Sequence, residues 1–384
     1  MTLFAPPLLD ETELEVIERI DALRATLRYT TERSLRWSGS LSRAMRARAV
    51  LGSNSIEGYE MPVDEGLAAL EGEEPQGTPS DTWSAISGYQ HAMTYVLQLA
   101  DDPHFEFSQG FIRSMHYMML SYDLRKHPGR WRPGPMYVRN EQKQEIVYEA
   151  PPANAVPALM AELIASLNDD RFPRLVHAAM AHLNLVMIHP FSDGNGRMAR
   201  CLQTLILARS GVIEQQFCSI EEWLGRHTAE YYDVLLNVGR GSWRPESDTL
   251  PWLRFNLKAH FQQAELLRVR AERTSMIWGE LEEIVRSVGL PERAIYALFD
   301  TTVGFRVRNG TYRKVAEVSE QIASRDLKAM VDAGLLQPAG EARGRSYSRS
   351  KTLVQLWQRT REKFPFVAVD PFVGGPGVEQ KTLF

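Results

Sequence analysis

The sequence has very little cysteine and no long apolar run. Its two cysteines, Cys201 and Cys218, have neither the number nor the spacing of a disulfide framework or a metal site, which favours a reduced setting. No stretch approaches the roughly 18 uncharged apolar residues that a membrane helix needs. Residues 1–10 lack the basic segment and apolar run of a secretory signal. We therefore expect a cytoplasmic protein that does not bind or cross a membrane.

The chain also lacks a large net charge, internal repeats and low-complexity tracts. Its 44 Lys/Arg and 48 Asp/Glu residues give a net charge of −4, which argues against nucleic-acid binding by the whole surface. A length of 384 residues exceeds one ordinary core and predicts two or three domains. We expect N-terminal helices, a helical core, a helical linker, a small C-terminal domain and a tail, in residues 1–60, 61–254, 255–290, 291–352 and 353–384.

Helical spacing of apolar residues dominates the chain, so the expected fold class is mainly α. The predicted helices are Glu11–Arg28, Leu41–Glu57, Thr82–Leu99, Ser108–Leu120, Ala155–Leu167, Leu175–Ile188, Asn195–Ala208 and Thr249–Val288. One region differs, because Gly134–Tyr148 contains two short β-rich runs and predicts a hairpin. The polar residues Arg139–Glu145 between the runs predict an exposed loop.

The C-terminal domain has its own pattern. Two short helical runs, Tyr312–Val318 and Glu320–Ala333, precede a Gly- and Arg-rich strip, Gly340–Tyr347. This order of helix, turn, helix and hairpin is typical of a winged helix-turn-helix. Between Phe305 and Lys351 there are 10 Lys/Arg and 5 Asp/Glu residues, a local balance of +5. This domain is therefore predicted to contact DNA or another protein.

The segment after Ile188 combines features of a phosphate site. Pro190 disfavours helical geometry at the preceding His189, so the helix must end there. Gly194 and Gly196 allow a tight turn whose amide groups point at one anion. The next helix begins at this turn and directs its positive dipole end to the same place.

Four ionisable side chains accompany this turn. Arg197 and Arg200 lie three residues apart on one helix and can reach the same anion. Asp193 is the one carboxylate beside them and suits Mg²⁺ bridging phosphates. His189 can act as a base toward an attacking hydroxyl near neutral pH. A lone His-Pro pair or Gly-Asn-Gly turn is usually structural, but the combination predicts a diphosphate cradle beside a general base.

The run His189-Pro-Phe-Ser-Asp-Gly-Asn-Gly-Arg197-Met-Ala-Arg200 resembles the Fic family motif at every defining position. The resemblance covers about residues 61–254. It implies an enzyme that transfers AMP from ATP to a Ser, Thr or Tyr hydroxyl of a target protein, with itself as one candidate target. Phosphate-transferring relatives carry Lys where this chain has Gly196, which favours AMP. The implied roles are His189 as base, Asp193 on Mg²⁺, Phe191 as loop anchor, Gly194, Asn195 and Gly196 around the phosphates, and Arg197 and Arg200 on the phosphate tail.

A second segment, Ser53-Asn54-Ser55-Ile56-Glu57-Gly58, resembles the family's inhibitory signature. Ser53 and Glu57 are four residues apart and share a helix face. The alternative is an ordinary solvated glutamate before a helix-stopping glycine. The resemblance implies that Glu57 pairs with Arg200, so that ATP binds with its α-phosphorus turned away from the hydroxyl. In some relatives the same glutamate helps to remove AMP, so the reverse reaction stays open.

Further roles come from the same resemblance. Tyr231 is expected to line the adenine pocket, although the asparagine that often follows eight residues later is Gly239 here. Asn184 is either a nucleotide or loop contact or a satisfied amide on the helix surface. The hairpin Gly134–Tyr148 resembles a flap that adds a strand to the target segment. Members of the family often dimerise, so a homodimer is a further expectation.

Two competing functions stay open. In one, the chain is a nucleotide-responsive DNA-binding regulator that uses basic residues of the C-terminal domain: Arg325, Lys328, Arg343 and Arg345. In the other, the chemistry is kept but the donor is another nucleotide or a phosphocholine carrier. Salt-dependent duplex binding without AMP incorporation would favour the regulator.

Overall fold

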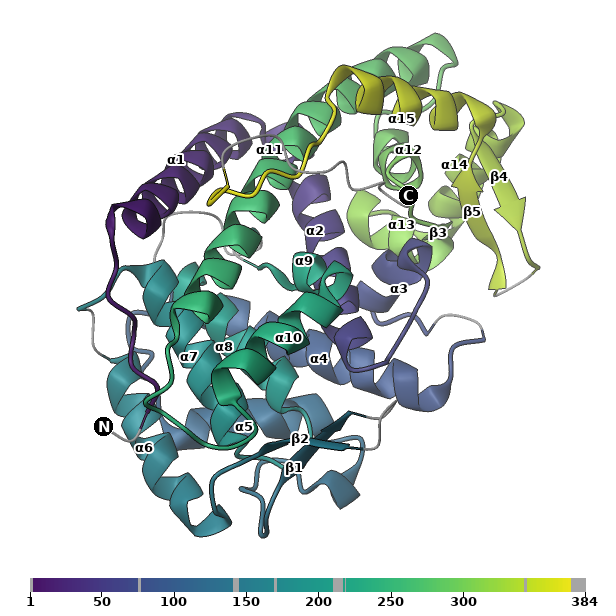
Figure 1. Cartoon of the computed structure of the whole chain (residues 1–384). Coiled ribbons are helices and arrows are strands. Elements are labelled where there is room, and N and C mark those ends of the chain that lie inside the picture. The colour runs from purple at the N-terminus through teal and green to yellow at the C-terminus, as the bar shows by residue number, and fades with distance from the viewer. Residues whose placement is uncertain are drawn as a thin grey trace.

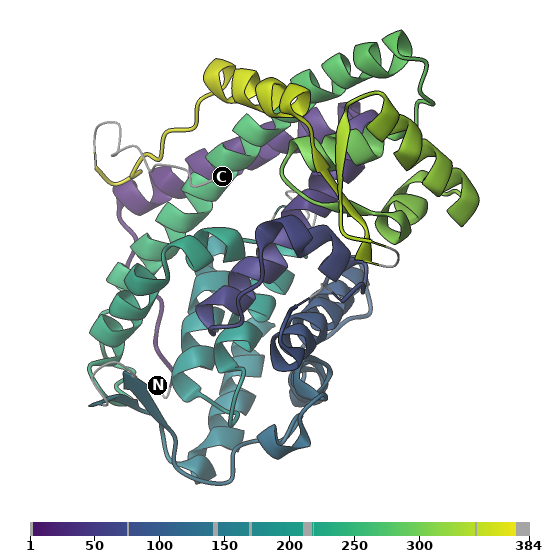
Figure 2. The same cartoon turned by 90° about the vertical axis from the view of Figure 1, so that its right-hand side faces the viewer.

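The chain is mainly helical, as expected. The computed structural model describes residues 3–74, 77–140, 145–168, 171–209, 217, 219–341 and 344–373. Cys218, Arg343, residues 141–144 of the predicted loop and the end of the tail lie outside this part of the chain. In Figures 1 and 2 a bundle of helices lies between a small hairpin at one end and a C-terminal group of helices and strands at the other.

Two long helices begin the chain, α1 (Glu11–Arg33) and α2 (Leu35–Ile56). Asp10 starts α1 by accepting a hydrogen bond from the Thr12 amide at 2.8 Å, while the Glu13 carboxylate accepts one from the Asp10 amide at 3.1 Å. α2 begins six residues before the predicted Leu41 because the two helices are separated by a single residue, Ser34. α2 ends at the segment that carries Ser53 and Glu57.

The central bundle forms from the helices that the apolar spacing predicts: α4 (Ser80–Leu99), α5 (Gln109–Leu120), α6 (Val156–Leu167), α7 (Arg174–Ile188) and α8 (Asn195–Ala208). Their bounds differ from the predicted ones by at most two residues. α7 and α8 pack against each other and are buried along nearly their whole length. The loop between them therefore emerges from a fully packed part of the core.

Several short elements are additional to the prediction: η1 (Val63–Glu65), α3 (Gly66–Leu70), η2 (Leu124–Lys126), η3 (Ala153–Ala155), α9 (Glu221–Arg226) and α10 (Thr228–Gly239). The long α11 (Leu250–Ser287) matches the predicted linker helix. It contacts α1, α7 and α10 and continues to the C-terminal group (Figure 1).

The predicted hairpin consists of β1 (Tyr137–Asn140) and β2 (Glu145–Glu149), which pair in antiparallel fashion. The buried Tyr148 fixes it to the core, since its hydroxyl donates to the carbonyl of Met187 at 2.9 Å. Tyr137 and Ile146 are 41% and 54% exposed, so the hairpin presents apolar side chains to solvent beside the loop after α7.

The C-terminal group contains α12 (Ala294–Thr302), α13 (Asn309–Ala316) and α14 (Glu320–Asp332) with a three-stranded antiparallel sheet in the order β3 (Val307–Arg308), β5 (Ser346–Arg349) and β4 (Leu336–Ala339). These elements follow the order expected of a winged helix-turn-helix. The segment predicted as tail begins instead with a helix, α15 (Lys351–Lys363). Its Leu353 and Leu356 are buried, which explains why it is ordered.

The C-terminal group docks on the segment that follows Gly58. Arg306 pairs with Asp64 at 2.7 Å and Lys314 pairs with Glu71 at 3.3 Å. A third pair, Arg308 with Glu65 at 2.9 Å, is nearly buried on both sides. Part of the local positive charge is therefore neutralised by the core.

Candidate active site

His189 is the residue at which α7 ends. Its backbone is left-handed, with φ 51° and ψ 57°, and its amide still donates to the Leu185 carbonyl at 3.0 Å. This conformation turns the half-buried imidazole out of the helix. We assign the ring proton to Nδ1, which lies 3.0 Å from the Val186 carbonyl oxygen. Burial lowers the pKa of His189, so at neutral pH Nε2 can accept a proton.

Phe191 and Asn195 hold the loop from inside. Phe191 is fully buried, as the anchor role implies. The Asn195 side chain accepts a hydrogen bond from the Phe191 amide and donates one to its carbonyl, each at 2.9 Å. Gly194 between them has φ 77°, and a Cβ there would lie 2.8 Å from Leu120. Gly194 and Asn195 are therefore required by the geometry of this turn. Gly196 was expected to share in the turn but lies inside α8, without a left-handed backbone.

Two residues that the sequence analysis missed support the loop. His116 stacks on Phe191 with ring centroids 3.7 Å apart, and its Nε2 lies 2.9 Å from the Asp193 carbonyl oxygen. Burial lowers the pKa of His116 to about 4, which keeps the ring neutral. Arg132 donates from Nε to the His189 carbonyl at 2.8 Å and from its amide to the Pro190 carbonyl at 2.9 Å. Both lie far from the loop in sequence and belong to no local pattern.

Arg197 is a buried cation with unused hydrogen-bonding groups. The side chain is 0% exposed, and all three guanidinium nitrogens lack a hydrogen-bond partner among the described residues. Its ion-pair partner is Asp193, at 3.6 Å. The Tyr59 ring centroid lies 5.2 Å from its guanidinium carbon. A buried charge with unmet donors is costly unless an anion completes it, so Arg197 fits a phosphate group.

Asp193 already has a cationic neighbour. Lys126, a third residue that the sequence analysis missed, lies 2.7 Å from its Oδ2 and also donates to the Tyr59 hydroxyl at 3.1 Å. Burial alone would raise the pKa of Asp193, but the Lys126 hydrogen bond and the Arg197 charge lower it. Within the described ranges no group of three His, Cys, Asp or Glu side chains could hold a metal. A cation at Asp193 would therefore need oxygen ligands from a bound substrate.

Glu57 contacts Arg200 as the sequence analysis expects. Its Oε1 accepts a hydrogen bond from Arg200 Nη2 at 2.8 Å. Ser53 completes the contact, because Arg200 Nε donates to its hydroxyl at 2.7 Å and Nη2 to its carbonyl at 3.0 Å. A Cβ on Gly196 would lie 2.5 Å from Glu57 Oε1. We call the contacts among Ser53, Glu57 and Arg200 the Glu57 clasp.

Two other predicted residues, Tyr231 and Asn184, lie in the core. Tyr231 is 1% exposed, and its hydroxyl lies 2.9 Å from His182 Nε2. Asn184 is a satisfied helix amide, because it bonds the amide and carbonyl of Phe4 at 2.9 and 3.1 Å, but it is buried and not on the helix surface as that alternative had it. Its hydrogen bonds serve the N-terminal segment rather than the loop. A Cβ on Gly239 would lie 3.1 Å from the Tyr148 ring, so the hairpin occupies the space of a larger side chain.

Comparisons with known proteins agree with this geometry. The model of the Fic/DOC family matches residues 106–207. The chain is 27% identical over 251 residues to protein adenylyltransferase Fic of Nematostella vectensis, covering 63% of this chain and 54% of that protein. It is 28% identical over 247 residues to protein adenylyltransferase fic-1 of Caenorhabditis elegans, covering 62% and 45%. The chain thus spans about half the length of the curated relatives it matches.

Solved structures extend the likeness in fold. A Fic family protein from Desulfovibrio desulfuricans aligns with a TM-score of 0.57 at 21% identity, covering 90% of this chain and 98% of that chain. Fic-1 of C. elegans aligns with a TM-score of 0.54 at 25% identity, covering 68% and 73%. In the described residues, no helix has the length and apolar content to span a bilayer. Residues 106–207, which contain the loop after α7, are a domain of the Fic/DOC family.

Proposed function

We propose that this chain transfers AMP from ATP to a hydroxyl group of a target protein. The buried guanidinium of Arg197 carries the proposal, because its nitrogens have no hydrogen-bond partner among the described residues and it lies beside the neutral imidazole of His189. The cation is complementary to a polyphosphate, and the imidazole can accept a proton released next to it. The relatives named protein adenylyltransferase support the same reaction.

In the proposed reaction the target hydroxyl oxygen attacks the α-phosphorus of ATP. The bond from that phosphorus to the bridging oxygen breaks, pyrophosphate leaves, and the hydroxyl proton moves to Nε2 of His189. Arg197, Arg200 and the amides of residues 194–196 would hold the negative charge of the phosphates. Asp193 would hold Mg²⁺ together with phosphate oxygens, and the ion would neutralise their charge.

The Glu57 clasp is proposed to inhibit this reaction. Arg200 is 1% exposed, and Nη2 is shared by Glu57 and the Ser53 carbonyl, which leaves Nη1 as its nitrogen without a partner among the described residues. A γ-phosphate that needs Arg200 must therefore compete with a charge-assisted pair. Loss of the Glu57 carboxylate should allow the productive pose of ATP.

Intact mass after incubation with ATP and Mg²⁺ tests the proposal. Wild type should gain little adenylyl mass, Glu57→Gly should gain much more, and His189→Ala in the Glu57→Gly background should gain none. His91→Ala, which removes an exposed histidine of α4, is the matched control and should behave as its parent. Equal labelling with and without His189 would contradict the role of the base. Equal labelling of wild type and Glu57→Gly would remove only the inhibition. GTP and CTP in place of ATP identify the donor.

The proposed partner is a target protein, and a homodimer and contacts of the C-terminal group remain predictions. The alternative of a DNA-binding regulator gains no support from Arg306, Arg308 and Lys314, since these residues pair with acidic side chains of the core. On α14, Lys328 is paired with Asp332 at 2.6 Å. Duplex binding by the full chain at low salt, lost at high salt, is the test.

A further inference from the structure

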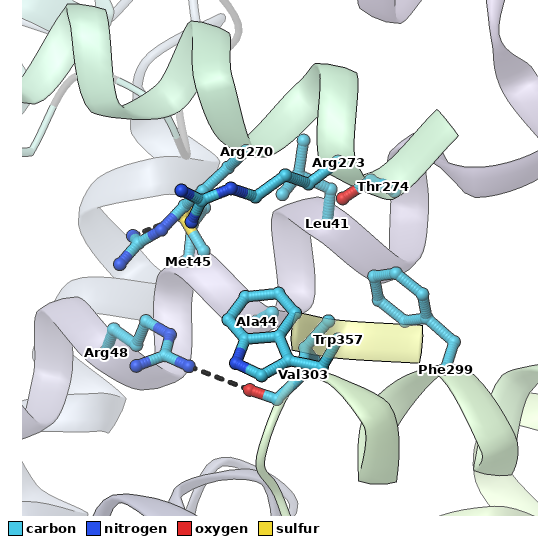
Figure 3. Close-up of a pocket in the computed structure, with 10 residues that line it drawn as sticks. All are labelled: Leu41, Ala44, Met45, Arg48, Arg270, Arg273, Thr274, Phe299, Val303 and Trp357. Atoms are coloured by element: carbon cyan, nitrogen blue, oxygen red, sulfur yellow. Dashed lines mark hydrogen bonds between the residues drawn. The ribbon is translucent and has the colours of Figure 1, made fainter. Parts of the chain in front are cut away.

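A cavity lies between α2 and α11 on one side and α12 and α15 on the other. Figure 3 shows its lining: Met45 and Arg48 come from α2, Arg270 and Arg273 from α11, and Trp357 from α15. Its empty volume is about 330 Å³, including the mouth that opens to solvent. Because much of this volume is open solvent at the mouth, the enclosed part takes only a group of a few atoms, and a larger ligand must extend out of the mouth.

The lining of this cavity is positively charged. Its ten residues include three arginines and no acidic residue. Behind the lining, Glu222 is the carboxylate that forms an ion pair with one of these arginines within the part of the chain that the structure describes. It contacts Arg270 at 2.5 and 2.7 Å and also Arg226 at 2.5 Å. One carboxylate thus serves two guanidinium groups, and none of its oxygens forms an ion pair with Arg48 or Arg273.

Arg48 and Arg273 use carbonyl oxygens instead of carboxylates. Arg48 Nη2 donates to the Val303 carbonyl at 3.0 Å. Arg273, 8% exposed, donates twice to the Phe364 carbonyl, at 3.0 and 2.7 Å. Burial, together with the charges of Arg361 and Arg270, lowers the pKa of Arg273 to about 10. Carbonyl dipoles leave the net charge of the cluster uncompensated, which is unfavourable in a buried place.

We propose that this cavity binds a phosphate group, either free phosphate or the phosphate of a small nucleotide. Phosphate oxygens would supply the missing negative charge and would compete with the carbonyl oxygens of Val303 and Phe364 for the guanidinium donors of Arg48 and Arg273. Trp357 lines the same cavity, and its ring centroid lies 5.6 Å from the Arg273 guanidinium carbon, so the ring helps to position that cation. The site joins α2, α11 and the C-terminal group, so a bound phosphate stabilises their docking.

The test compares thermal unfolding of the full chain in increasing inorganic phosphate, at ionic strength held constant with chloride. Because the Fic loop could bind phosphate too, all proteins carry Arg197→Gln. We expect a saturable rise in Tm of about 2–4 °C. Arg273→Gln should abolish the rise in Tm. Arg48→Lys keeps the charge but not the planar guanidinium, so it should raise the phosphate concentration at the midpoint about tenfold.

Arg359→Gln on the exposed side of α15 is the matched control and should retain the full effect. The same titration with AMP distinguishes free phosphate from a nucleotide as the ligand. A half-maximal Tm shift at a much lower concentration of AMP than of phosphate indicates a nucleotide, and equal concentrations indicate free phosphate. The proposal is overturned if neither ligand gives a saturable shift. It is also overturned if both Arg273→Gln and Arg48→Lys respond like their parent. Neither result bears on the AMP transfer reaction.

Discussion

The buried His182 should make the stability of the Fic domain depend on pH. It lies in the middle of α7, is 0% exposed, and packs against Trp252 with ring centroids 5.0 Å apart. One ring nitrogen hydrogen-bonds Gln203 and the other lies 2.9 Å from the Tyr231 hydroxyl. A neutral imidazole satisfies both contacts. A second ring proton would place a positive charge in a fully buried site, so we choose His182→Gln as the perturbation.

The magnitude follows from the two pKa values. Burial lowers the pKa of His182 from 6.5 to about 3, so the native state stays neutral between pH 7 and pH 5. The unfolded chain binds a proton in that window, which favours unfolding as the pH falls. Through this group the free energy of unfolding falls by about 2 kcal/mol between pH 7 and pH 5. Proton binding to the unfolded imidazole contributes about 1.4 pH units over this interval, and each unit is worth about 1.36 kcal/mol. The result depends little on how far below 5 the native value lies.

Other groups titrate in the same range, so the difference between wild type and variant is the quantity to measure. His182→Gln should be less stable at pH 7, and the gap should narrow by about 2 kcal/mol at pH 5. Native-state hydrogen exchange of α7 amides reports this locally, which avoids assuming that the whole chain unfolds in one step. A gap that stays constant within about 0.5 kcal/mol would refute the pH argument.

Three further predictions concern the loop, the clasp and the docking of the C-terminal group. Asn195→Ala should destabilise the Fic domain by about 2–4 kcal/mol, because it leaves the buried amide and carbonyl of Phe191 without partners; denaturant unfolding measures this. Gly196→Ala should push Glu57 away from Arg200, since its Cβ would lie 2.5 Å from the carboxylate, and should raise adenylyl incorporation in the intact-mass assay. Arg308→Ala should lower stability by about 1–3 kcal/mol, because the buried Glu65 carboxylate keeps only the longer contact with Arg306 at 3.5 Å, with Arg308→Ala/Glu65→Gln recovering part of the loss in a double-mutant cycle.

The sequence predicted well the features that neighbouring residues determine. Pro190 and the left-handed requirement of Gly194 act within a few bonds, so the end of α7 and the turn before α8 could be deduced directly. The apolar spacing of the core helices is equally local, which is why their bounds agree. The contact between Glu57 and Arg200 is different, because 143 residues separate the two side chains. It was predictable through the family resemblance alone.

The residues that the sequence analysis missed share a physical reason. His116, Lys126 and Arg132 act through the folded arrangement, since each comes from a separate element and meets the loop after α7. A histidine in an apolar helix face or a lysine in a short turn has no distinctive spacing. The helical state of residues 353–363 was missed for a related reason, because the burial of Leu353 and Leu356 against the C-terminal group orders a segment that ends in a Pro- and Gly-rich tail.

The helix α2 connects the C-terminal group to the Glu57 clasp. It contacts the C-terminal group through Arg48 and ends at Glu57, and a 22-residue helix spans about 33 Å. Near its end, a Cβ on Gly52 would lie 2.6 Å from the Glu221 carbonyl oxygen in α9. Contact that close leaves α2 no room to move toward α9. The packing of Gly52 against α9 therefore fixes the end of α2 from which Glu57 reaches Arg200.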